Sequence, residues 1–209
     1  IFHLFPGSSS FSIATVGCNF RCLQCQNHEI SQMPVDEGRI EGSDVPPSKV
    51  VSFAKEYRCP SISYTYTEPT IYFEYAYETA VLASRERIKN IFVTNGYMTE
   101  EALKAIQPYL DGANVDLKSF NENFYKEVCR ARLKPVLENL RLMREMGIWV
   151  EITTLVIPTL NDSDQEFENI AQFIVSLGPE VPWHISAFYP TYKMLRLPRT
   201  PVSSLHRAR

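Results

Sequence analysis

Two patterns of apolar residues alternate along the chain. A short run of mostly apolar residues is followed by a longer segment in which apolar residues recur among polar ones. Runs rich in β-branched and aromatic residues are typical of strands, and apolar residues three or four positions apart are typical of helices. The pattern predicts strands at residues 11–16, 61–67, 90–94, 113–117, 149–157 and 183–189. It predicts helices at residues 48–57, 71–86, 99–109, 121–146 and 163–177, the fourth broken at Pro135.

Strands that alternate with helices imply crossover connections and a parallel sheet, so the fold class is α/β. Periodicity leaves two architectures open, an open doubly wound sheet and a curved partial barrel. No glycine-rich phosphate-binding loop follows any of the strands, which argues against the first. Residues 31–47 are rich in Pro, Gly and acidic residues, and we expect an exposed connection there.

Length and composition fit a single domain over residues 1–209, with 44% hydrophobic and 22% charged residues. The formal net charge of −3 gives no basic surface, which argues against nucleic acid or an anionic membrane as a partner. No apolar run is long enough to cross a membrane, and the cysteine usage fits a reducing cytoplasm. Because the sequence begins with Ile1 and stops in a charged segment, we expect a fragment that lacks N-terminal and C-terminal extensions.

Three cysteines, Cys18, Cys22 and Cys25, follow the first predicted strand with the spacing C-x3-C-x2-C. Three thiols so close together predict a metal site, and cysteine thiolates are the usual ligands of iron–sulfur clusters. Such clusters take four ligands, so three cysteines would leave one iron without a protein ligand. That iron would be free to bind a reactant.

Two other uses of these thiols stay open. A disulfide would leave one of the three unpaired, and the sequence carries no secretory signal. A structural zinc site would use Cys22, Cys25 and His28, with Cys18 completing a tetrahedron. Structural zinc usually draws its ligands from two separated pairs, and the sequence has no second pair.

Polar residues also stand at the ends of the other predicted strands, where parallel α/β folds bind ligands. Each has a structural interpretation of its own: a helix N-terminal charge at Glu68, a turn at residues 94–96, and an ion pair between Asp116 and Lys118. Because all of them share one edge of the sheet with the cysteine loop, together they predict a binding site.

The cysteine spacing after a strand resembles the cluster-binding loop of the radical S-adenosylmethionine (radical SAM) enzymes, and the resemblance covers nearly the whole chain. It implies a partial (β/α)6 barrel of the TIM type. It also implies a [4Fe–4S] cluster on Cys18, Cys22 and Cys25, with S-adenosylmethionine (SAM) on the fourth iron. The reduced cluster would cleave SAM to methionine and a 5′-deoxyadenosyl radical that abstracts hydrogen from a substrate.

The resemblance assigns roles at the ends of the middle strands. Glu68 stands in a segment similar to the Gly-Gly-Glu-Pro motif, which implies that it binds the amino group of SAM. Asp116 and Lys118 resemble the Asp-x-Lys of glycyl-radical-enzyme activating enzymes, which places them beside the methionine and the reacting centre as the catalytic pair. Thr94 and Asn95 match that group's Thr-Asn-Gly, near the ribose.

Contacts to the adenosyl group are also implied, although the sequence departs from the family pattern at two places. Radical SAM loops usually carry an aromatic residue before the third cysteine, and this chain has Gln24 there. We therefore expect adenine to be contacted by Phe20 or by the strand-five backbone around Ile157, and the adenosyl group by His184. A second departure is that residues 66–67 replace the paired glycines of the strand-two motif.

Segments 63–70, 114–118 and 157–162 resemble the AmmeMemoRadiSam proteins, described as pyruvate formate-lyase activating enzyme homologues. The resemblance implies oxidoreductase activity, with a glycyl radical enzyme or another protein as substrate and flavodoxin or ferredoxin as electron donor. A small-molecule substrate, or a zinc-stabilised barrel that acts as a binding module, stays open as an alternative. We expect Cys59 and Cys129 to be packed thiols without a role.

Overall fold

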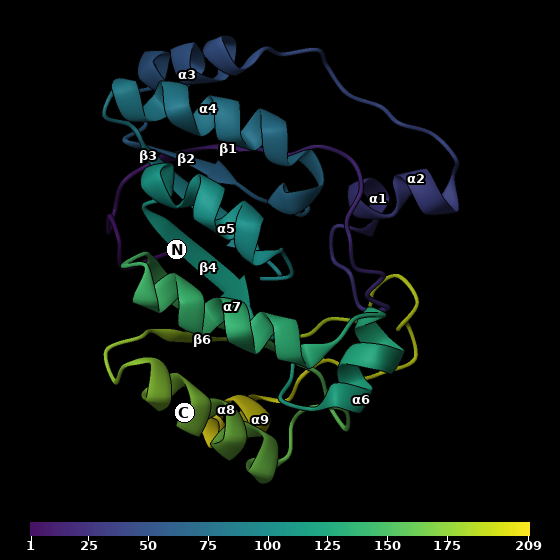
Figure 1. Ribbon diagram of the computed structural model, residues 1–209. Helices are drawn as coiled ribbons and strands as arrows, with labels where there is room; N and C mark the ends of the chain where they lie inside the picture. The colour runs from purple at the N-terminus through teal and green to yellow at the C-terminus, as the bar shows by residue number, and fades with distance from the viewer.

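The computed structural model describes residues 1–209 and is built around one six-stranded parallel sheet (Figure 1). The strand order in the sheet is the order in the sequence, and each strand pairs in parallel with the next. The first and last strands do not pair with each other, so the barrel is open between them. The strands are β1 (Ser10–Ile13), β2 (Ser61–Tyr64), β3 (Lys89–Thr94), β4 (Gly112–Asp116), β5 (Trp149–Val156) and β6 (Trp183–Ala187). The structure confirms the α/β partial barrel.

Helices connect the strands and form the outer layer of the molecule (Figure 1). Two of the long helices begin at side-chain caps: Thr99 accepts a hydrogen bond from the backbone N–H of Ala102, and Ser163 accepts one from that of Glu166. The long helices are α3 (Pro47–Glu56), α4 (Phe73–Arg85), α5 (Glu100–Ile106), α7 (Leu133–Glu145) and α8 (Asp164–Leu177). Short helical segments are η1 (Pro69–Tyr72), η2 (Gln107–Tyr109) and α9 (Val202–Arg207). None of the helices is both long and apolar enough to cross a membrane.

The main core lies between the sheet and these helices. Ile62, Phe92, Val115 and Ile152 come from four successive strands, and each is fully buried in one apolar cluster. Because side chains alternate between the two faces of a strand, the residues between them point to the inside of the barrel, the lumen. On β5 and β6 the lumen side carries four polar residues beside Leu155, so the inside of the barrel differs in chemistry from the helix-covered face; the four are Glu151, Thr153, His184 and Ser186.

Two segments differ from the sequence prediction. The stretch expected as an exposed connection, residues 31–47, starts at the end of the helical turn α1 (His28–Ser31) and contains a second turn, α2 (Met33–Asp36). The helix expected at residues 121–146 consists of α6 (Glu122–Phe124), a π-helical turn η3 (Tyr125–Cys129) and α7. The break is at Arg130, which adopts a left-handed φ of 58°. Pro135 lies in the first turn of α7, where its missing N–H leaves no helix hydrogen bond unmade.

The N-terminal residues lie against the amino-terminal ends of β4, β5 and β6. The ring centroids of Phe2 and His184 are 5.2 Å apart. A Cβ atom added at Gly112, the first residue of β4, would lie 3.2 Å from side-chain atoms of both Ile1 and Leu4. This segment therefore covers the end of the lumen that is opposite the cysteine loop.

Candidate active site at the carboxyl ends of the strands

Eight of the ten predicted site residues line one cavity of about 240 Å³. The loop after β1 contributes three cysteines to it, and the carboxyl ends of β2, β3 and β4 contribute the others. Lumen-facing Thr153, Leu155 and Ser186 close its wall on β5 and β6. The eight residues are Cys18, Cys22, Cys25, Glu68, Thr94, Asn95, Asp116 and Lys118. Their closeness in space is observed, and the roles assigned to them stay predictions.

The cysteine loop is held in place by backbone hydrogen bonds on both sides. Gly17 donates its N–H to the carbonyl of Ile30 at 2.9 Å, and it has a φ of 103° that favours glycine. Further along the loop, Arg21 donates to the carbonyl of Cys129 at 3.1 Å and Leu23 to that of Val128 at 3.0 Å. The α1 helix and the π turn η3 therefore fix the direction in which the thiols point.

The spacing of the three thiols in space bears on which metal group they fit. All five cysteines of the chain are free thiols. A tetrahedral zinc ion with Zn–S bonds of about 2.3 Å needs sulfur atoms roughly 3.8 Å apart. The structure has one group of three or more His, Cys, Asp or Glu ligand atoms within 4.8 Å of one another, and it contains none of these cysteines. At least one distance between the three sulfur atoms therefore exceeds 4.8 Å, which is more than tetrahedral binding of one zinc ion allows and fits a multi-iron cluster.

Two of the three cysteines also have polar neighbours. Cys18 accepts hydrogen bonds from the backbone N–H of Phe20 at 3.4 Å and from Asn95 Nδ2 at 3.8 Å. The Cys25 Sγ lies 3.1 Å from Ser31 Oγ. Burial raises the pKa of Cys18 to about 12 and also raises that of Cys25. Bound iron would supply the positive charge that a thiolate needs in such a buried place.

His28, the other residue of the zinc alternative, does not line the cavity. Its ring stacks on Tyr192 with centroids 4.7 Å apart. The hydroxyl of Tyr192 donates to Asp36 at 2.6 Å, and the ammonium of Lys193 lies 3.6 Å from the same carboxylate. His28 thus joins the α1 and α2 helices to the segment after β6.

Glu68 lies fully within the protein and receives four hydrogen bonds. Its Oε1 accepts from the N–H and hydroxyl of Thr70 at 3.2 and 2.6 Å and from the hydroxyl of Thr94 at 2.8 Å. Its Oε2 accepts only the N–H of Asn95, at 2.8 Å. Burial raises the pKa of Glu68, and the hydrogen bonds oppose that rise. Oε2 is therefore the oxygen with capacity left for a cationic ligand.

Asp116 and Lys118 form an ion pair at the edge of the cavity, with Nζ 3.0 Å from Oδ2. Burial alone would lower the pKa of Lys118, but the charges of Asp116, Cys22 and Cys129 raise it well above its usual value. The ammonium group therefore stays charged beside the cysteine loop. Cys129 is buried as expected, and its backbone carbonyl accepts the N–H of Arg21 in the cysteine loop. No spacing in the sequence indicates that contact.

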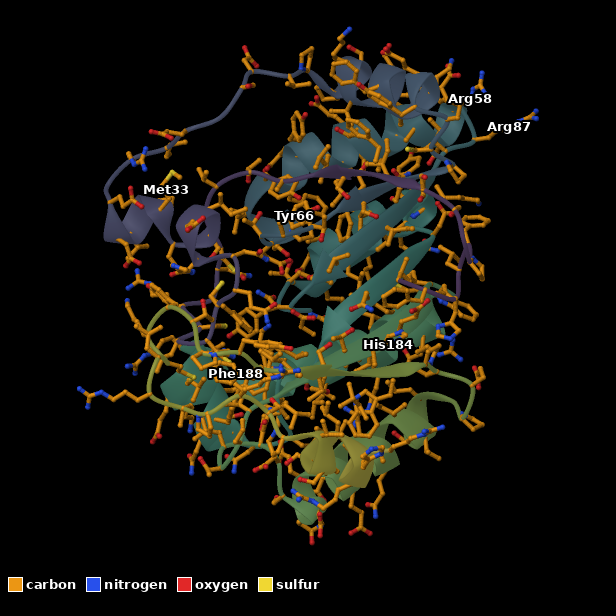
Figure 2. All side chains as sticks on the ribbon, turned by 180° about the vertical axis from the view of Figure 1, so that it is seen from behind. Met33, Arg58, Tyr66, Arg87, His184 and Phe188 are labelled. Atoms are coloured by element: carbon orange, nitrogen blue, oxygen red, sulfur yellow. The ribbon has the colours of Figure 1, made fainter.

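Two predicted site residues are not brought to the cavity. Ile157 is fully buried in the core, and its N–H donates to Asn161 Oδ1 at 2.6 Å. His184 lies two residues before the cavity-lining Ser186, about 7 Å towards the amino end of β6, and its Nε2 is 2.7 Å from Glu151 Oε2. Figure 2 shows His184 well apart from Tyr66 and from the helix that carries Met33. The structure thus gives no support to SAM contacts by these two residues.

Tyr66, which stands in place of a motif glycine, keeps the backbone geometry that glycine favours. Its φ is 63°, in the left-handed region, and its carbonyl accepts a hydrogen bond from Asn27 Nδ2 at 2.8 Å. Tyr66 is 55% exposed and lines the cavity together with Thr65 and Thr67. Asn27, Thr65 and Tyr66 are cavity residues that sequence reasoning did not nominate for a role. The alternation of strand residues would have identified Thr65.

Comparisons with known proteins agree with this geometry. The sequence model of the Radical SAM superfamily matches residues 12–174. The chain is 46% identical over 210 residues to an uncharacterized protein of Methanocaldococcus jannaschii, a match that spans 100% of this chain and 62% of that protein. It is 27% identical over 185 residues to a protein of the same organism that is provisionally named a glycyl-radical enzyme activating enzyme. That match spans 87% of this chain and 68% of the relative.

The fold also matches solved structures. Streptococcus suis SuiB bound to S-adenosylmethionine superposes with a TM-score of 0.73 over 96% of this chain and 46% of that one. The sequence identity is 14%, so this likeness shows the fold. The chain thus spans about half to two thirds of the proteins it is compared with.

Proposed function

The chain belongs to the radical SAM superfamily, and from that premise we propose that it carries the active site of an enzyme that generates a glycyl radical in a partner protein. Membership in the superfamily implies a [4Fe–4S] cluster and SAM. The observation that carries the proposal is the joint position of Cys18, Cys22, Cys25, Glu68 and Lys118 around one cavity. These residues supply the thiolates, the anion and the cation that a cluster and an amino-acid ligand require.

Three cysteines would hold the cluster. Cys18, Cys22 and Cys25 each place a sulfur in the cavity wall, and the backbone hydrogen bonds of the loop keep that arrangement before any metal arrives. The amide of Asn95 and the N–H of Phe20 reach Cys18 and would stabilise its thiolate. The loop therefore pre-organises the site, which lowers the entropic cost of cluster binding.

Acidic and basic residues would orient SAM. Glu68 offers Oε2 to the ammonium group of the methionyl part, while Thr94 and Thr70 hold its other oxygen. Lys118, paired with Asp116, presents a positive charge suited to a carboxylate. When bound, the cluster and SAM supply one electron and the 5′-deoxyadenosyl group that removes a hydrogen atom from the substrate. The chain's own contribution is orientation and exclusion of water.

The partner assignment rests on the relative whose name refers to glycyl-radical enzyme activation and on the form of the site. No backbone hydrogen bonds pair β1 with β6, so the sheet does not close into a complete barrel. The exposed Tyr66 lies at the wall of the cavity. An opening of this kind suits a peptide loop that enters from a partner protein. Flavodoxin or ferredoxin would serve as the electron donor.

The test uses anaerobically reconstituted protein, SAM, a reductant, and a candidate glycyl radical enzyme with deuterated glycine. The proposal predicts deuterium in 5′-deoxyadenosine and a glycyl radical signal in the electron paramagnetic resonance spectrum of the partner. Omission of the partner should remove the deuterium and leave only slow SAM cleavage. Deuterium transfer from a free small molecule, with none from any protein, would contradict the partner assignment and leave the SAM chemistry standing.

A further inference from the structure

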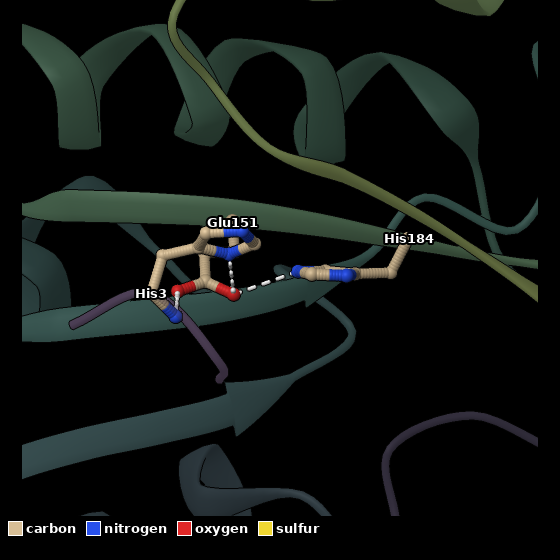
Figure 3. A group of neighbouring side chains, drawn as sticks. All are labelled: His3, Glu151 and His184. Atoms are coloured by element: carbon tan, nitrogen blue, oxygen red, sulfur yellow. Dashed lines mark hydrogen bonds and ion pairs between the residues drawn. The ribbon is translucent and has the colours of Figure 1, made fainter. Parts of the chain in front are cut away.

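Three side chains from distant parts of the sequence meet at the amino end of the barrel: His3, Glu151 and His184 (Figure 3). We call this group the floor triad. His184 Nε2 lies 2.7 Å and His3 Nδ1 3.5 Å from the same oxygen, Glu151 Oε2. The two rings are stacked with centroids 5.4 Å apart. One ligand atom from each residue lies within 4.8 Å of the other two.

The charge at the floor triad lacks a cationic partner of the usual kind. The side chain of Glu151 is 0% exposed, and its ion-pair partners are two histidines, with no lysine or arginine among them. A buried carboxylate is costly to keep unless a positive charge accompanies it. A divalent cation between the carboxylate and the two imidazoles would supply that charge.

The ligand atoms suit a transition-metal ion. Zinc bound by two histidines and one carboxylate needs bonds of about 2.0–2.1 Å, so its ligand atoms lie roughly 3.3 Å apart. The observed separations of 2.7 and 3.5 Å bracket that value. His3 has 54% and His184 18% of its side chain exposed, so an ion and a water molecule can enter from solvent.

The second carboxylate oxygen is held by other donors. Glu151 Oε1 accepts the N–H of His3 at 2.8 Å and the indole Nε1–H of Trp149 at 3.0 Å. Metal sites commonly orient their ligands through such outer hydrogen bonds. Oε2 accepts the N–H of Phe2 at 2.9 Å and also faces the two rings.

From this geometry we propose that the floor triad binds one divalent ion of the zinc class through His3 Nδ1, Glu151 Oε2 and His184 Nε2, with water as the fourth ligand. The ion would join the N-terminal segment to β5 and β6 and close the amino end of the barrel. None of the three residues lines the cysteine cavity. Thr153, which does line it, follows Glu151 by two residues and pairs with His184, and the cavity-lining Ser186 follows His184 by two residues.

The experiment titrates cobalt(II), as a visible probe of zinc sites, into the full chain in which Cys18, Cys22 and Cys25 are all changed to Ser. We expect one ion per chain, with the absorption of a nitrogen and oxygen site and no thiolate band. Zinc should displace the cobalt. His3→Ala and His184→Ala should each weaken binding more than about 100-fold, and Trp149→Phe about 10-fold.

Two variants serve as controls. Trp183→Phe removes an indole hydrogen bond to Thr154 Oγ1 of the same 3.0 Å length, and His206→Ala removes a histidine from α9; both should bind cobalt as the parent does. Circular dichroism checks that each variant is folded. Because the His3 side chain is exposed, His3→Ala removes a proposed ligand without disturbing the packing of the core. Absence of stoichiometric binding, or equal binding by His3→Ala and the parent, would overturn the proposal. Zinc analysis of the cluster-loaded parent then measures the number of zinc ions bound per chain when the three cysteines are present.

Discussion

The two ends of the barrel lumen hold their ligand groups at different spacings. At the carboxyl ends, three thiols line a cavity of about 240 Å³, and at least one distance between their sulfur atoms exceeds 4.8 Å. At the amino ends, the atoms of the floor triad lie within 4.8 Å of one another. A multi-iron cluster needs the first spacing and a single ion needs the second. Donor spacing therefore distinguishes two kinds of metal chemistry within one barrel.

The two buried carboxylates at these ends also differ. Burial raises the pKa of Glu68. Burial would raise the pKa of Glu151 too, but hydrogen bonds from Phe2 N–H, the Trp149 indole, His3 N–H and His184 lower it to about 2. Because each carboxylate accepts four hydrogen bonds from these donors, the opposite directions of the two pKa shifts reflect the stronger desolvation of Glu68 rather than the number of donors.

The largest effect is expected from removing a cluster ligand. Cys22→Ala should abolish incorporation of acid-labile sulfide and reductive SAM cleavage, because the two remaining thiols cannot hold the cluster. Cys59→Ala, which removes a buried thiol outside the cavity, should retain both. Sulfide analysis after anaerobic reconstitution measures the outcome. A full content of acid-labile sulfide in Cys22→Ala would show that this thiol is not needed to hold a cluster. The contrast between a cluster site at one end of the lumen and a single-ion site at the other would then fail.

A smaller effect is expected from Glu68→Gln, which keeps the shape and removes the negative charge. A charged hydrogen bond contributes about 1.5–3 kcal/mol, so SAM should bind roughly 10- to 100-fold more weakly. The matched control is Glu166→Gln, a buried carboxylate on α8 that accepts from Ser119 and Phe120 outside the cavity. Equilibrium dialysis with reconstituted protein measures the affinity. Equal losses in both variants would show that Glu68 acts only through stability.

Lys118→Met should lower the rate of SAM cleavage about tenfold while sulfide content stays at the parent level. The change removes the cation paired with Asp116 but leaves the cysteine ligands intact. Lys126→Met, an exposed lysine of η3, is the control and should match the parent. Loss of sulfide in Lys118→Met would mean that the ammonium supports the cluster loop rather than the ligand.

The smallest effect concerns the floor. Trp149→Phe removes a donor to a charged oxygen and should lower the free energy of unfolding by about 2 kcal/mol. Trp183→Phe removes a donor to a neutral hydroxyl and should cost about 1 kcal/mol. Chemical denaturation of the two variants compares them directly. Equal losses would contradict the idea that Glu151 is held as a charged group.

Groups at the carboxyl end could be predicted from the sequence because each lies in a short local motif. The cysteines stand within one loop, and Glu68, Asn95 and Lys118 follow strands whose apolar runs are easily recognised. Since parallel strands end at the same edge, strand prediction alone places these groups together.

The floor triad could not be predicted in the same way. Its members stand at positions 3, 151 and 184, and no spacing connects them. His184 was expected near the adenosyl group because it lies on β6, but the alternation of strand residues fixes only its face and not its depth in the lumen. The break near Arg130 was missed for a related reason, because a π turn stabilised by contacts to the cysteine loop has no local signature.

The central claim is that the carboxyl-end cavity holds a cluster that acts on SAM. Its most direct test is one anaerobic sample in which acid-labile sulfide, 5′-deoxyadenosine and methionine are measured together after reduction with SAM. Sulfide counts the cluster alone, since an ion in the floor triad brings none. The account predicts about four sulfides per chain and equal amounts of 5′-deoxyadenosine and methionine. Protein that takes up zinc but no sulfide, and that leaves SAM intact, would contradict it.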